Sequence, residues 1–246
     1  MVAVWVPCMR WYAKTHDRTR IVSVVPIGTE PLVQDFSDEV VKISMKGKPD
    51  RWLCDGKKSK PMKNIVADKW YIPDCSKYDP WGRIWRNYAD GRKRTYDVCI
   101  HARAIHRHKS ANRNWPKEHY DLLVQKLRAA HPDISIASIG SPDGAMHIDG
   151  TKDMRNQSIH FAIFALSQSR LCLGPSSGPM HLAAHCGTPH LVWTENKRQK
   201  SIGNLTNRDR YERLWNPLRT PVKVIDKFGW QPPVDYIHSK AENFLL

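Results

Sequence analysis

The sequence lacks any long apolar run. No stretch reaches the ~18 consecutive apolar residues that a membrane-spanning helix requires. The N-terminal residues also lack the charged segment followed by an apolar stretch that marks a secretory signal. We therefore expect a soluble protein that is not exported and is located in the cytoplasm, with peripheral attachment to a membrane surface as an alternative.

Cysteine is scarce, and the six cysteines never show the C-x-x-C spacing of a zinc or redox site. Two histidine pairs, His106 with His108 and His181 with His185, lack an acidic or thiolate ligand at metal-binding spacing. We therefore expect reduced thiols, as is usual in the cytoplasm. We expect no metal and no cofactor.

Acidic residues are few relative to basic ones. The 246 residues include 24 Asp and Glu but 39 Lys and Arg, which gives a formal net charge of +15. Such a charge attracts phosphate groups, nucleic acids and anionic lipid headgroups. Because 41% of the residues are hydrophobic, the chain can bury the core of one large domain or two small ones. The composition thus excludes a disordered tail and a disulfide-stapled miniprotein.

From about residue 96 the sequence alternates between short apolar runs and longer amphipathic segments. The runs have the length of buried strands, and the segments between them carry apolar residues at helical spacing. The expected strands are residues 96–102, 134–139, 170–174 and 190–194, and the expected helices are residues 116–130, 159–168 and 179–186. This alternation predicts an α/β fold with a parallel sheet and right-handed crossovers.

The first 95 residues show a weaker pattern. We expect a helix over residues 3–16 and strands over residues 21–27 and 39–44. Residues 46–94 are basic and rich in proline and tryptophan, which indicates long loops.

The chain is expected to divide into three parts. Residues 1–95 form a small α/β lobe, and residues 96–225 form a larger lobe with the parallel sheet. Residues 226–246 form a tail that ends in an amphipathic helix.

Residues 170–194 carry the strongest chemical signal. An apolar strand runs into Pro-Ser-Ser-Gly, and the next helix opens with Pro179, which suits a first helical turn. Unpaired N–H groups at such a helix start face the carboxyl edge of the sheet, where they stabilise a bound phosphate. The expected anion ligands are Ser176, Ser177, Gly178 and, in the first turn, His181. A plain strand-to-helix turn, with Gly178 giving backbone freedom, is the alternative.

The same segment resembles a motif of glycosyltransferase family 9, the heptosyltransferase-like proteins. That family has an acidic residue, then Ser or Thr, Gly-Pro-Met-His-Leu-Ala-Ala and a later Gly-x-Pro. Residues 177–184 and 187–189 match this pattern. Residues 113–120 resemble a second family motif, a basic residue before Trp-Pro-x-Glu. The similarity covers about residues 96–195, and the two motifs occur in the family's order.

The resemblance implies a GT-B-like architecture, in which two Rossmann-like lobes face each other and the second holds most of the donor. Residues 1–95 would then be a reduced acceptor-side lobe, and residues 96–225 would bind a nucleotide sugar. Arg113 matches a basic residue that reaches the donor phosphate in the family. The loop and helix start that hold the diphosphate match Ser177, Gly178, Pro179, Met180 and His181.

The sequence departs from the family at two points. Ser176 stands where the family has an acidic residue that helps to hold the donor. The family's base, an aspartate in a glycine-rich loop, follows a first strand that would precede Met1. Three explanations remain open: the chain is truncated, another carboxylate replaces the base, or the protein binds the donor without catalysis.

Further candidate residues lie in loops at the carboxyl edge. The basic loop after the strand at 96–102 carries Arg103, Lys109 and Arg113, and guanidinium groups pair well with phosphate oxygens. A solvated basic loop is the alternative. Gly140 and Asp143 follow the next strand and are expected on the nucleoside side, although turn chemistry alone also explains them.

Glu195 follows the last strand of the motif and is our candidate for the catalytic base. Its alternative is a surface loop residue without a role. Tyr211 and Trp215 lie among arginines, and their rings are able either to stack on a base or an acceptor ring or to pack the tail across the two lobes.

These observations predict a glycosyltransferase that moves a sugar from a nucleotide-diphosphate sugar to an unidentified acceptor by direct displacement with inversion. The net charge favours an anionic acceptor such as a glycolipid, a polysaccharide or a nucleic acid. A nucleic-acid-binding protein is the first alternative, since positive charge and tryptophans suit phosphate backbones and bases. It lacks support from any helix-turn-helix, zinc-finger or RRM signature. An inactive nucleotide-sugar binder is the second alternative.

Overall fold

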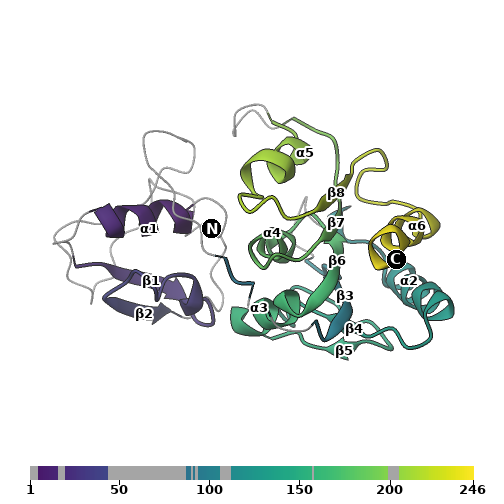
Figure 1. Cartoon of the computed structure of the whole chain (residues 1–246), viewed down its shortest axis with the longest axis horizontal. Coiled ribbons are helices and arrows are strands. Elements are labelled where there is room, and N and C mark those ends of the chain that lie inside the picture. The colour runs from purple at the N-terminus through teal and green to yellow at the C-terminus, as the bar shows by residue number, and fades with distance from the viewer. Residues whose placement is uncertain are drawn as a thin grey trace. The chain divides into compact units, whose positions relative to one another are not determined.

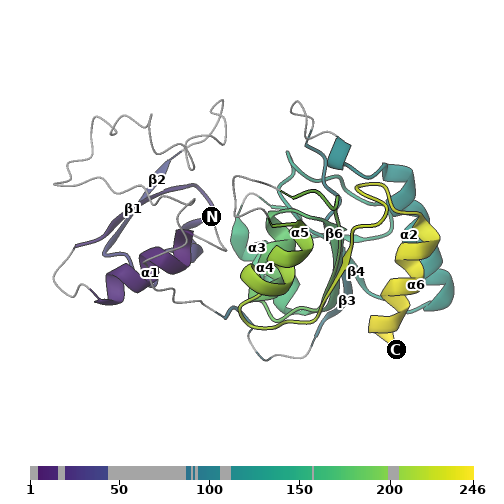
Figure 2. The ribbon, with the colours of Figure 1, turned by 90° about the horizontal axis from the view of Figure 1, so that it is seen from above.

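The structure, a computed structural model, describes residues 5–15, 20–43, 87–89, 91, 94–105, 112–156, 158–198 and 205–246. The chain forms two compact units, Met1–Trp85 and Arg86–Leu246. Each unit is described by itself. Figures 1 and 2 show the elements of both units from two directions.

The first unit contains a small parallel sheet. Strand β1 (Val22–Pro26) pairs with β2 (Glu39–Ile43), and helix α1 (Trp5–Thr15) precedes them. A short 3-10 turn, η1 (Glu30–Leu32), connects the two strands. The buried Arg10 of α1 ties the helix to this connection, because its guanidinium contacts Asp35 at 2.7 Å. The helix and both strands expected in this region are confirmed.

The second unit is built on a six-stranded sheet in which every neighbouring pair is parallel. The strands are β3 (Tyr96–Ile100), β4 (Ile136–Ser138), β5 (Lys152–Asp153), β6 (Ser169–Pro175), β7 (His190–Trp193) and β8 (Val222–Ile225). They lie in the order β5-β4-β3-β6-β7-β8. This arrangement confirms the α/β class and the parallel sheet.

Helices cover both faces of this sheet. They are α2 (Lys117–Ala130), α3 (Ile159–Ser167), α4 (Gly178–His185) and α6 (Val234–Leu245), with a short α5 (Asn207–Asp209) that continues into a π-helical turn, η5 (Arg210–Leu214). Figure 1 shows α2 and α6 together on one face and α3 and α4 on the other. The tail helix α6 packs against α2 within this unit. None of the helices described is long and apolar enough to cross a membrane.

The periodicity of α2 explains why it covers the sheet. Its four buried residues, Tyr120, Leu123, Val124 and Leu127, fall on one face of the helix. They join a core with the rings of Trp115 and Trp193, which are fully buried and 5.0 Å apart between centroids. Truncation of such a buried ring to alanine typically costs about 3–5 kcal/mol.

The order of the strands defines where this sheet changes direction. From β3 the chain builds outward to β4 and β5, then returns and builds the other way from β6 to β7 and β8. Doubly wound sheets with this order bind their ligands outside the carboxyl ends of the two strands at the change of direction. In this unit these strands are β3 and β6.

Candidate functional site

The carboxyl ends of β3 and β6 approach each other closely. The His101 N–H donates to the carbonyl of Leu173 at 2.9 Å. Gly174 permits this approach, because a Cβ at its position would lie 2.9 Å from the His101 carbonyl oxygen and 3.0 Å from the sulfur of Met180. The loop after β3, with Arg103, and the loop after β6, with Ser176, therefore leave the sheet side by side.

The loop after β6 forms the start of α4. Ser177 is the N-cap residue, and its side chain makes no capping hydrogen bond to the helix. Its hydroxyl oxygen is buried without a partner among the described residues. Gly178 is exposed, and a Cβ there would meet nothing within 4 Å. An uncapped helix start with open space beside it favours a bound anion.

Two arginines lie in the loop after β3. Arg103 is 6% exposed and donates to Asn114 Oδ1 at 2.6 Å. The guanidinium of Arg113 stacks on the ring of Trp230 at 4.9 Å. Burial and the nearby charge of Arg113 lower the pKa of Arg103. The fold thus holds two positive charges close together at the carboxyl edge.

His181 lies in the first turn of α4, where the sequence placed it. Its ring stacks on Tyr211 with a centroid distance of 4.9 Å and an interplanar angle of 11°. The ring of Trp215 meets it edge-on at 4.1 Å. Burial lowers the pKa of His181 to about 3, so its ring is neutral at neutral pH. It is able to offer an N–H to an anion but supplies no positive charge.

Helix α5 and the turn η5, which follow β7 in the chain, contact the end of β7 and the loop after β6. Asn207 Nδ2 donates to the buried hydroxyl of Thr194 at 2.6 Å, and Arg210 donates to Asn207 Oδ1 at 3.1 Å. The hydroxyl of Tyr211 donates to Ser176 Oγ at 3.3 Å. Tyr211 and Trp215 both contact the ring of His181 within this unit, and their stacking on a ligand ring stays a prediction. Sequence analysis did not find the contact with Ser176, because the two residues are 35 positions apart.

Other buried residues at this edge were also missed by sequence analysis. His101, at the end of β3, has Nδ1 3.2 Å from the carbonyl of Ile139, and burial lowers its pKa to about 4. Trp230, which supports Arg113, lies in the loop after β8.

The remaining candidates occupy different places at the carboxyl edge. Glu195 follows β7, is 25% exposed in its side chain and forms an ion pair with Lys197 at 3.0 Å. Gly140 has a φ of +127° and packs beside the His101 ring, whereas Asp143 is exposed in the next turn.

The side chains of two residues at the helix start are partly or fully buried. Pro179 is partly buried in the first turn, and the Met180 side chain is fully buried with its sulfur 3.5 Å from Cys172 Sγ. Lys109 lies outside the described residues. The binding roles of all these candidates stay predictions.

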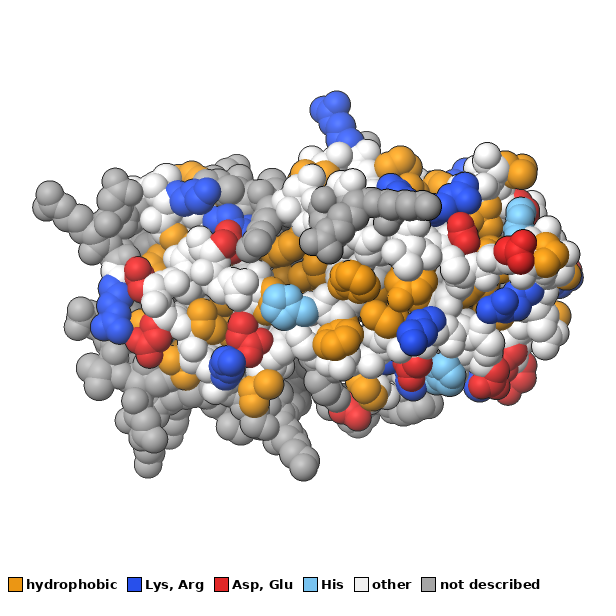
Figure 3. Space-filling model, turned by 60° about the horizontal axis from the view of Figure 1, so that its bottom comes forward, with side chains coloured by type: hydrophobic (Ala, Val, Ile, Leu, Met, Phe, Trp, Pro, Cys, Tyr) orange, Lys and Arg blue, Asp and Glu red, His pale blue; other side chains and the backbone are white. Residues whose placement is uncertain are grey.

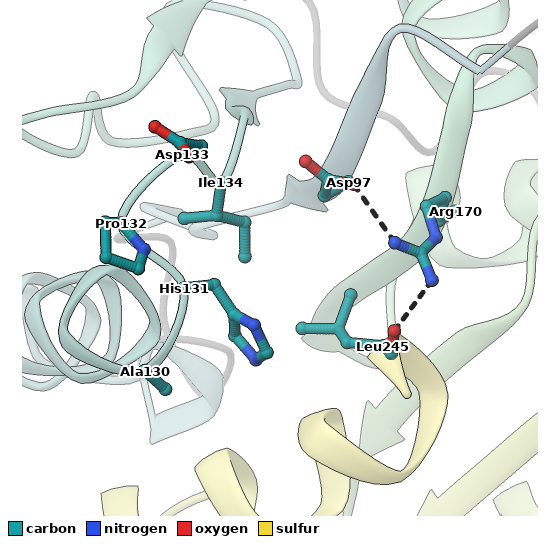
Figure 4. A pocket seen from close by; sticks show the side chains of 8 residues that line it. All are labelled: Asp97, Ala130, His131, Pro132, Asp133, Ile134, Arg170 and Leu245. Carbon is teal, nitrogen blue, oxygen red and sulfur yellow. Dashed lines mark hydrogen bonds and ion pairs between the residues drawn. The ribbon is translucent and has the colours of Figure 1, made fainter.

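An open pocket of about 350 Å³ lies at the opposite, amino edge of the same sheet (Figure 4). In it Arg170 donates to Asp97 Oδ1 at 3.3 Å and to the carbonyl of Leu245 at 2.7 Å. Against the raising effect of burial, hydrogen bonds from Ser135 and Arg170 hold the pKa of Asp97 below its usual value. These polar groups satisfy one another, so this pocket is not our candidate site.

Helix α3 presents a second surface feature away from the switch point. Phe161 and Phe164 are each 45% exposed. Figure 3, which looks at the side of this unit where α3 and β5 lie in Figure 1, shows hydrophobic side chains in a group there. Among the residues described, no group of three or more histidine, cysteine and acidic side chains is arranged to hold a metal ion.

No family model and no curated protein match the chain. A solved glycosyl transferase of family 9 from Veillonella parvula is similar in structure, with a TM-score of 0.46 and 12% sequence identity. The similarity covers 63% of this chain and 48% of that protein. The chain thus spans about half the length of this structural relative.

Proposed function

We propose that the protein is a glycosyltransferase that uses a nucleoside-diphosphate sugar as its donor and needs no metal or other cofactor. The main observation behind the proposal is that two loops meet at the switch point of the sheet, the gap between β3 and β6 where the strand order changes direction. One loop brings Arg103 and Arg113, and the other brings the uncapped start of α4. A diphosphate carries the charge and the hydrogen-bond acceptors that these groups favour.

In the proposed reaction, an acceptor hydroxyl attacks the anomeric carbon of the sugar directly. A base takes the proton of that hydroxyl, and the bond between the anomeric carbon and the diphosphate oxygen breaks. The helix start and the arginines stabilise the negative charge on the departing diphosphate. A single displacement of this kind inverts the anomeric configuration. Glu195 is the proposed base, because it leaves the sheet one strand away from the Ser-Ser-Gly loop.

The acceptor is proposed to be anionic. The net charge of +15 favours a phosphate-bearing or acidic glycan over a neutral one. A glycolipid acceptor would bring the protein to a membrane surface, and an acidic polysaccharide or a nucleic acid would not.

A thermal-shift panel of nucleoside diphosphates and their sugar conjugates tests the proposal. A ligand at 100 times its dissociation constant adds about 2.7 kcal/mol of stability, which raises the melting midpoint by several degrees. Nucleoside monophosphates are the matched ligand controls, and they should give a smaller shift. A panel with no shift for any diphosphate would reject the donor site.

Two other outcomes would favour the alternatives. Tight binding of random oligonucleotides with a steep loss of affinity in salt, and no response to sugar nucleotides, would favour nucleic-acid binding. Donor binding without transfer and without slow donor hydrolysis would favour an inactive nucleotide-sugar binder.

A further inference from the structure

Tyr211 connects the π-helical turn η5 to the loop after β6. Its side chain is fully buried, and its hydroxyl donates to Ser176 Oγ at 3.3 Å. Burial raises the pKa of Tyr211, whereas hydrogen bonds with Ser176 and the backbone of Ser177 lower it by less. The phenol is therefore protonated at neutral pH and is able to donate.

Neighbouring rings fix the direction of the Tyr211 side chain. His181 stacks on its face at 4.9 Å, and Trp215 meets it at 5.2 Å with an interplanar angle of 89°. Three rings in mutual contact leave few rotamers open to any of them. The hydroxyl of Tyr211 consequently has one position relative to Ser176.

The backbone of η5 is fixed as well. The Trp215 N–H donates to the Arg210 carbonyl at 2.6 Å and closes the wide turn. Arg210 also bonds Asn207, and Asn207 bonds Thr194 at the end of β7. A π-helical turn inserts one extra residue, which changes the direction of the side chains that follow, and such turns are frequent at functional sites.

Ser176 is the residue before the helix start that the proposed function assigns to the diphosphate. Its N–H is already used, because it donates to the Trp193 carbonyl at 2.9 Å. Its hydroxyl accepts from Tyr211, so the backbone and the side chain of Ser176 are both held. The next two residues, Ser177 and Gly178, begin the uncapped turn.

We propose that Tyr211 is a positioning residue for donor binding. Its hydroxyl holds Ser176 and the backbone N–H of Ser177, and thereby fixes the Gly178 N–H group in the direction of a nucleoside diphosphate. Tyr211 itself does not touch the donor. This inference rests on the proposed function, since it assumes that the loop after β6 binds the diphosphate.

A double-mutant cycle in ligand affinity tests the inference. The proteins are the whole chain and its variants Tyr211→Phe, Ser176→Ala and the double variant. The probes are the nucleoside diphosphate with the largest shift in the panel and the corresponding nucleoside. Tyr236→Phe is the matched control, because Tyr236 lies on α6 and packs against Phe228, away from the loop after β6. Urea unfolding of each protein separates loss of affinity from loss of folding.

The expected result is a loss of diphosphate affinity of about threefold to tenfold for each single variant, the size of one neutral hydrogen bond. The double variant should lose no more than either single variant, because both remove the same contact. Nucleoside affinity and the affinity of Tyr236→Phe should stay unchanged.

Four results would overturn the inference. Unchanged affinity in Tyr211→Phe, or losses that multiply in the double variant, would show that the hydroxyl does not position the loop. Tighter binding in Tyr211→Phe would show that the hydroxyl occupies the place of the diphosphate. A wild-type chain that binds none of the diphosphates would reject the proposed function, and the inference with it.

Discussion

At the scale of single residues, the positive charge of the candidate site comes from arginine and not from histidine. The sequence placed Arg113 and His181 near the same anion. Burial leaves the His181 ring neutral, whereas an arginine stays charged in almost any surrounding. Residue type and spacing were enough to name both side chains as candidates, and their binding roles stay predictions. They were not enough to assign the charge of the imidazole, which depends on the rings that pack against it.

Arg113→Ala should weaken binding of a nucleoside diphosphate by about 1.5–3 kcal/mol, the usual worth of a hydrogen bond to a charged group. Titration calorimetry measures this loss. Arg128→Ala is the matched control, because Arg128 lies at the far end of α2 and bonds the carbonyl of Gly150. Equal affinity in a folded Arg113→Ala protein would place Arg113 outside the donor site.

Glu195→Gln should lower turnover by about 10²–10⁴-fold, the usual contribution of a general base. Donor affinity should change little, since the base acts on the acceptor hydroxyl. Initial rates of sugar transfer, or of donor hydrolysis, measure the effect. Glu118→Gln in the exposed first turn of α2 is the control. A Glu195→Gln protein with full activity would remove Glu195 from the mechanism.

At the scale of the elements, the local sequence pattern predicted the buried strands but missed the two outermost strands of the sheet, β5 and β8. Most residues of strands β3, β6 and β7 are buried, and helical spacing marked α2 and α3 between the strands. Strand β5 consists of two exposed residues, and β8 has only two buried ones. Strands β5 and β8 form because they pair with a neighbouring strand, so their own sequence shows no strand pattern. The same holds for η5, because its Tyr211 bonds Ser176, which lies 35 residues earlier in the chain.

The close contact between β3 and β6 predicts a specific effect at Gly174. Gly174→Ala should destabilise the fold by about 1–3 kcal/mol, because its Cβ would press on the His101 backbone. Gly178→Ala, with open space around its Cβ, should leave folding stability nearly unchanged. Urea unfolding of both variants measures the contrast. Equal stability of the two variants would mean that the close contact between Gly174 and the His101 backbone does not contribute to the stability of the fold.

At the scale of the whole molecule, the position of the candidate site follows from topology. Alternation of strands and helices was enough to expect a parallel sheet and a ligand at its carboxyl edge. The order of the strands, which depends on long-range pairing, was not predicted. That order selects the gap between β3 and β6 out of all the positions along the edge. Topology also explains why the pocket at the amino edge is not the expected place for a donor.

The second unit carries buried imidazoles at two places in its sheet, His101 directly after β3 and His190 at the start of β7. Burial lowers the pKa of His101 to about 4 and that of His190 to about 4. Both values lie below the ~6.5 of an exposed histidine. The folded state therefore holds these rings neutral over a range of pH in which the unfolded chain binds protons.

We expect the free energy of unfolding to fall as the pH drops from about 6.5 to about 4. Between these values the unfolded state binds more protons than the folded state, so stability rises with pH and levels off above the unfolded pKa. Carboxyl groups with lowered pKa values, such as Asp97 and Asp226, lose their contribution only at lower pH. Urea unfolding at intervals between about pH 4.5 and about pH 8, which spans the titration of an exposed histidine, measures how the free energy of unfolding changes with pH. His190→Gln should reduce this slope. A flat profile below about pH 6.5 in the wild-type protein would show that these imidazoles are not held neutral by the fold.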